Sequence, residues 1–498
     1  MDIVGNIASG FQDAISPINL LFCFAGVLLG TVIGVLPGLG QTTGVAILLP
    51  LTLGLRPLTA FILLAGIYYG TQYGGTISSV LIATPGEPST VVTTLDGYQL
   101  ARQGRAGQAL AIAAVGSFLA GTISIVFLMT LAPVFSNFAL NFGPPETFAL
   151  MVLGMTAVVG FSGGSAIKGL AMAALGIAIS TVGIDAQTGI ARFTFGNVEL
   201  LGGIGFVEVI IGLFAVSEVM TQVKAGGTEP IRTRMKDMLL TRDDWHRSRM
   251  PIVRGGIIGF LIGVLPGAGA TLASFFSYDL ERRMSKHPDE FGRGAIEGVA
   301  APEAANNAAV NGAFVPTLTL GIPGSATTAV LLGAFLLFGI RPGPLLIEQQ
   351  PDLVWGLMAS FYIGNVFLLI LNLPLAPLFA SMLRLRYAFV YPVILLMSFV
   401  GAYAIENSMW GVWVAFGFGV LGYFMKRYEF PAAPVILGLV LGGLMEKTIV
   451  QTSSMGGGSL GIFLERPIAL VLFALALLAI LGPHLVTGAR ALATAGSR

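Results

Sequence analysis

The sequence is poor in charged side chains. Only 10% of its 498 residues are charged, against roughly 25% in an ordinary soluble domain. So few charges cannot cover a water-exposed surface, and 55% of the residues are hydrophobic. Several apolar stretches approach or exceed the roughly 20 residues that span a bilayer as a helix. We therefore predict an all-α polytopic membrane protein with about ten to twelve hydrophobic segments. These stretches include 110–133, 148–160, 200–219, 354–374 and 467–481.

Other absences exclude whole classes of chemistry. The single cysteine, Cys23, rules out a disulfide framework. No GxxxxGK[ST] motif occurs, which excludes ATP hydrolysis by a P-loop. The three histidines, His246, His287 and His484, fall in basic loops or near the tail, so they predict neither a transition-metal cluster nor a histidine-based nucleophile. Residues 457–461 match G-x-S-x-G without strand context. We predict no enzyme, no cofactor and no nucleic-acid partner.

Two blocks of sequence occur twice. Residues 26–40 read GVLLGTVIGVLPGLG and residues 255–269 read GGIIGFLIGVLPGAG, so five glycines and a proline match at an offset of 229. Residues 76–92 and 314–330 match through Pro85 and Pro323 at an offset of 238. A weaker third match joins Leu-Ala-Pro at 131 with Leu-Ala-Pro at 375. The chain therefore contains two related halves. We divide it into an N-terminal membrane repeat (1–222), a basic linker (223–250), a C-terminal membrane repeat (251–485) and a tail (486–498).

The basic residues predict that the two halves have opposite orientations. Basic residues favour the cytoplasmic side of short loops. After the first block, basic residues are abundant in the second half and scarce in the first half. After the second block the bias is reversed, with more basic residues in the first half than in the second. This pattern indicates an inverted-topology repeat, which is common in secondary transporters. The residues compared are Arg282, Arg283, Lys286 and Arg293 against Arg56, and Arg102 and Arg105 against Arg341.

The linker predicts a re-entrant hairpin. Residues 224–254 are rich in basic side chains and should be cytoplasmic, as should the loop after residue 280. Only the 29 or so residues 252–280 lie between them, too few for two crossings at about 1.5 Å per residue. The natural tip is 265–269, and its counterpart is 36–40. The basic residues are Lys224, Arg232, Arg234, Lys236, Arg242, Arg247, Arg249 and Arg254.

Four Pro-Gly pairs lie within apolar segments, at Pro37-Gly38, Pro85-Gly86, Pro266-Gly267 and Pro323-Gly324. Such pairs break a helix and free its polar ends, which is tolerated in a membrane only where protein or a water-filled cavity covers them. The N–H groups of a half-helix suit an anion, and the freed carbonyls suit a cation. The alternative is that the pairs are kinks or close helix contacts, which we prefer for the ladder Gly26, Gly30 and Gly34.

These considerations give the candidate site residues. Carbonyls around Gly38, Gly40, Gly267 and Gly269 would hold a coupling cation, Na⁺ or H⁺. Hydroxyls after the breaks, together with the amide of Asn307, would hold the substrate; the hydroxyls are those of Thr42, Thr43, Ser89, Thr90, Thr271, Ser325, Thr327 and Thr328. Polar groups close to the breaks would line the site, or cap helix ends: Glu87, Glu303, Asn306, Asn307 and Asn311. We expect Asp185, Glu208, Glu218 and Glu406 to be interhelical partners or near-interface residues.

The motifs resemble those of the large membrane permease subunit of the tripartite tricarboxylate transporters. The resemblance covers about residues 15 to 480, and it rests on order, spacing and duplication together. The motifs are GVLPGLGQTTGVAILLP (34–50), YYGTQYGGTISSVLIATPGEPST (68–90), APEAANNAAVNGAFVPTLTLGIPGSATTAVLLGAF (301–335) and FGIRPGP (338–344).

The resemblance implies a multi-pass permease of the bacterial inner membrane. It would work with a small four-helix membrane subunit and a periplasmic solute-binding protein that captures a carboxylate such as citrate. An ion gradient would drive the symport, and similarity to other ion-coupled carboxylate carriers implies an elevator mechanism. The alternatives are a stand-alone carboxylate carrier, which needs no partners, and an ion channel built around the duplicated breaks.

Overall fold

The computed structural model describes residues 3–161, 165–185, 188–222, 230–231, 235–384 and 387–480. This part of the chain is mostly helical, and its one small sheet pairs β1 (Gly183–Ile184) with β2 (Ala191–Arg192) antiparallel. Seven of its helices are long and apolar enough to cross a membrane, and three further apolar helices are shorter. The prediction of a helical protein with many membrane-spanning segments is confirmed in this coarse form: the described part of the chain is mostly helical, with seven candidate spans and one small sheet. The predicted linker residues Lys224, Arg232 and Arg234, His484 and the tail lie outside the described residues.

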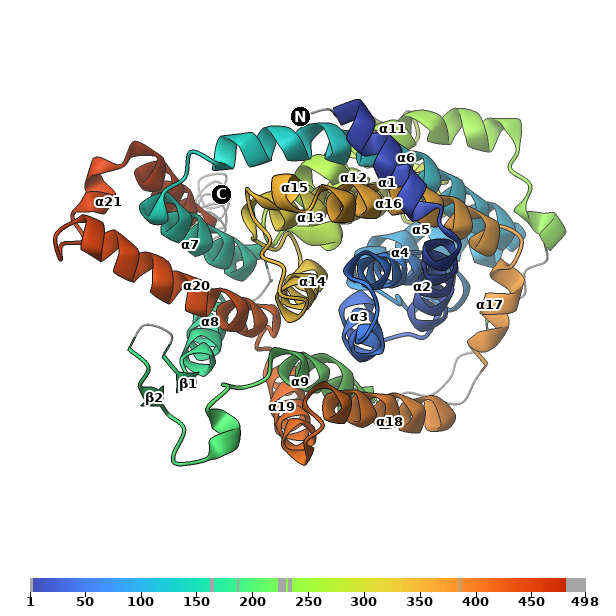
Figure 1. Cartoon of the computed structure of the whole chain (residues 1–498). Coiled ribbons are helices and arrows are strands. Elements are labelled where there is room, and N and C mark those ends of the chain that lie inside the picture. The colour runs from blue at the N-terminus through green and yellow to red at the C-terminus, as the bar shows by residue number, and fades with distance from the viewer. Residues whose placement is uncertain are drawn as a thin grey trace, which may run out of the picture.

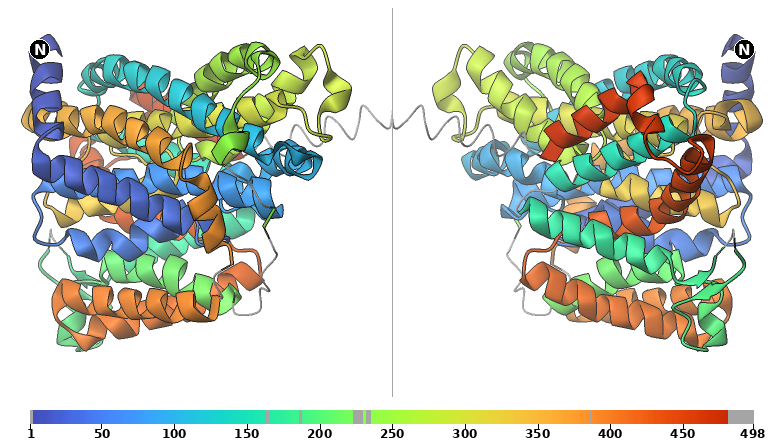
Figure 2. Two further views of the ribbon diagram at one scale, coloured as in Figure 1. Left: turned by 90° about the vertical axis from the view of Figure 1, so that its right-hand side faces the viewer. Right: turned by 90° about the vertical axis from the view of Figure 1, so that its left-hand side faces the viewer.

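A central bundle is built mainly from the first and third quarters of the chain (Figure 1). α4 and α13 lie inside it, and every residue of α13 from Glu297 to Thr319 is buried. Many of the long helices lie close to horizontal in the two views of Figure 2. The bundle comprises α1 (Ile3–Ala14), α2 (Pro17–Val35), α3 (Gln41–Leu48), α4 (Pro57–Ile82), α5 (Val91–Leu100), α6 (Ala106–Ala139), α11 (Arg242–Val264), α12 (Gly269–Met284), α13 (Glu297–Leu320), α14 (Ala326–Leu337), α15 (Leu346–Gln349), α16 (Pro351–Asn372) and α17 (Ala376–Met382).

Two smaller groups of helices flank the bundle (Figure 1). In one group α20 packs on α7 and α8, and in the other α19 packs on α18 and on the continuous helical segment 206–222. The first group comprises α7 (Pro144–Phe161), α8 (Ala166–Ser180), α20 (Ala433–Met455), α21 (Ile462–Glu465) and helix Pro467–Ile480. The second comprises α9 (Phe206–Ile210), the π-helical η5 (Ile211–Val216), α10 (Ser217–Gln222), α18 (Tyr387–Glu406) and α19 (Met409–Arg427).

Short helical turns complete the chain. Two of them join α5 to its neighbours: η2 (Pro88–Thr90) precedes α5, and the π-helical η3 (Ala101–Arg105) follows it. The others are η1 (Leu49–Thr52), η4 (Val198–Leu200), η6 (Met235–Met238) and η7 (Pro288–Glu290). α11 begins at Arg242, so residues 242–250 of the predicted linker are helical.

The weaker third sequence match falls on corresponding but unequal helices. Leu131–Pro133 lies inside α6, which continues through Pro133 to Ala139. Leu375–Pro377 lies at the start of α17, which is separated from α16 by a turn. The matched Leu-Ala-Pro segments therefore sit in one long helix in the first half and at a helix boundary in the second.

Glycine ladders bring the two helix pairs of the bundle into close contact. A methyl group at Gly26, Gly30 or Gly34 of α2 would collide with the backbone of α4, at Leu63, Ile67 and Thr71. Methyl groups at Gly255, Gly259 and Gly263 of α11 would collide in the same way with Ala301, Ala305 and Ala309 of α13. The ladder is therefore a close-packing stripe, as predicted, because only a residue without a side chain lets the backbones approach this closely.

The basic loops gather at one end of the bundle. Arg105 bonds to Asp244 of α11 (2.5 Å), and Gln103 donates to the Arg293 carbonyl (2.7 Å). Arg247 pairs with Glu297 (2.8 Å). Loops 101–105 and 285–296 and the start of α11 are therefore neighbours. The start of α4 has a different neighbour: the ring of Phe61 stacks on that of Phe335 in α14, with 3.9 Å between the ring centroids.

The glycine ladders give a test of this packing. We expect Gly30→Ala and Gly259→Ala each to lower the free energy of unfolding by about 1–3 kcal/mol, because the added methyl group overpacks a helix contact. The matched control is Gly417→Ala in α19, where a methyl group meets nothing within 4 Å. It should be neutral or slightly stabilising, since alanine favours helix. Denaturation of purified protein in detergent measures the difference. Equal stability of all three variants would contradict close packing at the ladder.

Candidate functional site

Two matching helix breaks come from the first repeated block. α2 ends at Val35 and α3 begins at Gln41, while α11 ends at Val264 and α12 begins at Gly269. Gly38 and Gly40 have φ values of 89° and 50°, and their counterparts Gly267 and Gly269 have 78° and 59°. This left-handed backbone favours glycine. The Pro37-Gly38 and Pro266-Gly267 turns therefore share one backbone design.

The second repeated block also interrupts a helix in each half. α4 ends at Ile82, and α5 resumes after η2. α13 ends at Leu320, and α14 begins at Ala326. Ser325 caps α14, because its hydroxyl accepts a hydrogen bond from the Thr328 amide (3.2 Å). Pro85-Gly86 and Pro323-Gly324 lie in these two interruptions.

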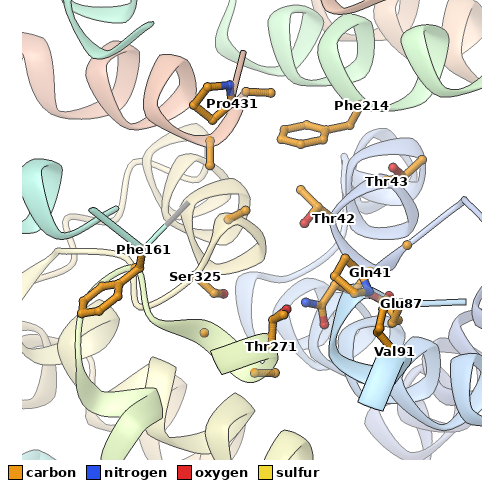
Figure 3. Close-up of a pocket in the computed structure, with 18 of the residues that line it drawn as sticks. Gln41, Thr42, Thr43, Glu87, Val91, Phe161, Phe214, Thr271, Ser325 and Pro431 are labelled. Carbon is orange, nitrogen blue, oxygen red and sulfur yellow. The ribbon is translucent and has the colours of Figure 1, made fainter. Parts of the chain in front are cut away.

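All four breaks meet around one cavity of about 700 Å³. The first turns of α3, α12 and α14 open onto it, and so does the η2 turn before α5. Figure 3 shows Gln41, Thr42 and Glu87 on one side of the cavity, facing Ser325 and Thr271. The backbone N–H groups at the start of a helix have no partner within the helix and carry a partial positive charge. Several such ends around one cavity make it suitable for an anion.

The cavity has a further wall that comes from the flanking helices. It includes Val158 and Phe161 of α7, Phe214 of η5, Glu218 of α10 and residues 431–433 at the start of α20. Glu218 is paired with Lys426 of α19, as expected of an interhelical partner. The cavity therefore lies between the central bundle and both flanking groups.

The predicted site residues divide into two sets. One set lines the cavity: Gly38, Gly40, Thr42, Thr43, Pro85, Gly86, Glu87, Gly267, Gly269, Thr271 and Ser325. The other set does not: Pro37, Ser89, Thr90, Pro266, Pro323, Gly324, Thr327, Thr328, Glu303, Asn306, Asn307 and Asn311. The two sets differ in what surrounds their side chains.

The hydroxyls behind the cavity bond to protein. The Thr327 hydroxyl bonds to that of Thr42 (2.9 Å), so it joins α14 to α3. Ser89 donates to the side-chain oxygen of Gln72 (2.8 Å). Ser79 donates to Thr90 (2.8 Å). These groups hold the breaks together.

Glu303 lies in a separate polar cluster within the bundle. Its carboxylate accepts hydrogen bonds from the Thr76 hydroxyl (2.7 Å) and from Thr93. Asn311 of the same helix accepts from Tyr69 and donates to Ser124 (2.7 Å). This cluster joins α13 to α4, α5 and α6, which is the pairing that buried polar groups require.

Three of the other acidic residues lie away from this cavity. Asp185 faces Arg192 (4.0 Å), which also bonds to Glu446 (2.5 Å). Glu208 and Glu406 line a second, largely apolar cavity of about 360 Å³ formed by α8, α9, α14, α18 and α20.

Several cavity residues were missed from the sequence. Gln41 directly follows the first break, and its polar side chain in an apolar segment was a usable signal. Phe161, Phe214 and Pro431 gave no signal, because aromatic and proline residues at helix ends are ordinary in such a chain. These three residues reach the cavity only because the flanking helices pack against the bundle in this way.

Comparisons with known proteins agree with the sequence motifs. The profile of the "Tripartite tricarboxylate transporter TctA family" matches residues 20–437. A protein of Agrobacterium vitis, named "Uncharacterized 52.8 kDa protein in TAR-I ttuC' 3'region", is 46% identical over 478 residues, which are 96% of this chain and 95% of the relative. A second, "Uncharacterized protein in TAR-II ttuC' 3'region", is 47% identical over 223 residues, 45% of this chain and 92% of the relative. No solved structure gives a significant match.

The single buried cysteine allows a direct test of the cavity. In a Cys23→Ala background, we expect Thr271→Cys and Ala326→Cys to react with a small anionic thiol reagent on the order of tenfold faster than a buried control, because reactivity follows exposure. The control is Thr319→Cys in α13, which is fully buried and does not line the cavity. Reaction rates in detergent, followed by mass spectrometry, measure this. Equally slow labelling at all three positions would show that water does not reach the breaks.

Proposed function

Because the chain belongs to the TctA family of tripartite tricarboxylate transporters, we propose that it is a large permease subunit that imports small carboxylates, such as citrate or related organic acids, driven by an ion gradient. As a family member it is a multi-pass membrane component of a transporter and not an enzyme. We place it in the bacterial inner membrane. Its partners are a small four-helix membrane subunit and a periplasmic solute-binding protein.

The convergence of helix starts on one cavity carries this proposal. The first turns of α3, α12 and α14 face the cavity with N–H groups that have no partner within their own helix, and Thr42, Thr271 and Ser325 add hydroxyls. An organic anion is the ligand that such an arrangement favours. A cavity of about 700 Å³ is also within the range of roughly 300–1,000 Å³ that is usual for small-molecule sites.

The other ends of the broken helices suit a cation. α2 ends at Val35 and α11 at Val264, shortly before Gly38, Gly40, Gly267 and Gly269, which line the cavity. A helix C-terminus carries partial negative charge. We propose that the coupling cation binds close to these breaks, Na⁺ at carbonyl oxygens or H⁺ at a neighbouring carboxylate, and that its gradient drives uptake.

Three observations support an inverted repeat. The ladder of α2 packs on α4 as the ladder of α11 packs on α13. The loop after α5 lies beside the loop after α12, which is not its sequence counterpart. The counterpart of the loop after α5 is the turn after α14. This turn lies near the start of α4, because Phe335 at the end of α14 stacks on Phe61. Equivalent loops at opposite ends of the bundle are what two inverted halves require.

An elevator mechanism is consistent with the contacts between halves. Thr42 bonds to Thr327 (2.9 Å), and Tyr68 bonds to Ser325 (3.1 Å), so the breaks of both halves are tied together. We propose that the hairpins α2–α3 and α11–α12 and the broken helices α4–α5 and α13–α14 move as a unit. During this movement, the hairpins and broken helices would slide along the wall formed by Phe161, Phe214 and Pro431.

The dependence on a binding protein separates this proposal from its two rivals. In proteoliposomes that contain the permease and its small membrane subunit, we expect saturable citrate uptake only when the binding protein is added. Added binding protein should raise the rate on the order of tenfold or more, because it delivers substrate at high local concentration. Uptake that is equally fast without binding protein would indicate a stand-alone carrier. Unitary conductance in a planar bilayer would indicate a channel.

The cavity hydroxyls should contribute to carboxylate affinity. Thr271→Val removes a hydroxyl that has no protein partner among the described residues, and it keeps the shape of the side chain. We expect KM for citrate uptake to rise roughly tenfold, because a hydrogen bond to a charged group contributes about 1.5–3 kcal/mol. The matched control is Thr130→Val on the exposed face of α6, where the hydroxyl bonds only to its own helix. An unchanged KM for Thr271→Val would remove this hydroxyl from the site.

A further inference from the structure

The two halves of the cavity differ at one equivalent position. At the offset of 238 that aligns the second blocks, Glu87 corresponds to Ser325. Both lie against the matching glycine of the adjacent break: a methyl group at Gly40 would lie 3.9 Å from Glu87 Oε2, and one at Gly269 would lie 3.7 Å from Ser325 Cβ. The same place in the cavity therefore carries a carboxyl group on one side and a hydroxyl on the other.

Glu87 has an incomplete set of hydrogen bonds. The side chain is 2% exposed, and the backbone of Gln41 hydrogen bonds to its carboxylate. The other carboxylate oxygen, Oε1, is buried and has no hydrogen-bond partner in the described part of the chain. Glu87 also lines the cavity. A buried oxygen without a partner calls for a ligand, because leaving it bare is costly.

No cationic side chain among the residues that line the cavity compensates Glu87. Among the residues that line the cavity, the other ionisable group is Glu218, which is paired with Lys426. Tyr68 of α4 bonds to Ser325, and Glu303 of α13 is held by Thr76 and Thr93. The lining residues of α3 and α12 carry no ionisable side chain. An ionised Glu87 would therefore repel an anion that enters the cavity.

We infer that Glu87 is the coupling group of the transporter: a monovalent cation, Na⁺ or H⁺, must neutralise its carboxylate before a substrate carboxylate binds on the opposite side, at Ser325, Thr271 and the first turns of α12 and α14. This inference rests on the proposed function and assigns the two sides of the cavity to different ligands. The α3 side takes the cation, and the α12–α14 side takes the anion.

The backbone near Glu87 fits this division. Gly86 packs so closely on the end of α2 that a methyl group there would collide with the Gly34 carbonyl oxygen. The Gly34 carbonyl at the end of α2 therefore lies beside the residue that precedes Glu87, and a helix-end carbonyl and a carboxylate both attract a cation. On the other side, Ser325 and Thr271 offer neutral donors at helix starts. A substrate bound there and a cation at Glu87 would stabilise each other.

Citrate binding by the purified chain tests the inference. The dissociation constant is measured as a function of Na⁺ concentration at fixed pH, and as a function of pH without Na⁺. In the wild type we expect affinity to rise at least tenfold with one of the two cations, and the two series identify which. Glu87→Gln should bind citrate without that cation, within about threefold of the cation-saturated wild type, because its neutral side chain resembles the neutralised carboxyl group.

The control variant lies at the equivalent position. Ser325→Ala should weaken citrate binding and keep the wild-type cation dependence. A shift of the melting temperature by cation alone, without citrate, provides a readout that does not involve the substrate: it should occur in the wild type and in Ser325→Ala and be lost in Glu87→Gln. Gain of cation-independent binding cannot be mimicked by misfolding.

Three outcomes would overturn the inference. Glu87→Gln could keep the wild-type cation dependence, it could fold yet bind no citrate under any condition, or Ser325→Ala could lose the cation dependence instead. A wild-type protein that shows the cation shift but binds no citrate, malate or succinate would instead contradict the proposed function. The cation shift without substrate therefore separates the two failures.

Discussion

The central constraint on this structure is that a helix broken inside an apolar protein leaves backbone groups that need partners. Water is absent from the bilayer interior, so such breaks persist only where protein or a polar cavity covers them. Here four breaks meet around one cavity. Gly267 donates to the Gly324 carbonyl (3.0 Å), so two of the breaks also satisfy one another. The first turns of α3, α12 and α14 face the cavity, and in the proposed function their N–H groups would bind the anion.

Close packing is what keeps the breaks in place. The glycine ladders hold α2 against α4 and α11 against α13, close to the points where these helices are interrupted. Polar contacts then join the halves, as when Tyr69 of α4 bonds to Asn311 of α13. Because buried polar groups are costly to leave unpaired, these contacts fix how the halves fit together. The cavity is a consequence of that fit.

The sequence predicted the features that depend on local chemistry. Pro-Gly pairs, left-handed glycines such as Gly38 and Gly267, and the glycine ladders act over a few residues, so their positions could be predicted. It predicted less well which hydroxyls face the cavity. Ser325 lines it, whereas Thr327 and Thr328 turn toward protein, because successive residues of a helix point in different directions. Phe161 and Phe214 could not have been predicted, since they reach the cavity only through the packing of distant helices.

The central claim is that the four helix breaks form a binding site for a carboxylate. A cryo-EM structure of the purified chain with citrate, at a resolution that shows side chains, tests it most directly. The account predicts density for citrate in the cavity, with its carboxylates against the first turns of α12 and α14 and within hydrogen-bonding distance of Thr271 and Ser325. Citrate bound elsewhere in the protein, with this cavity empty, would contradict the account.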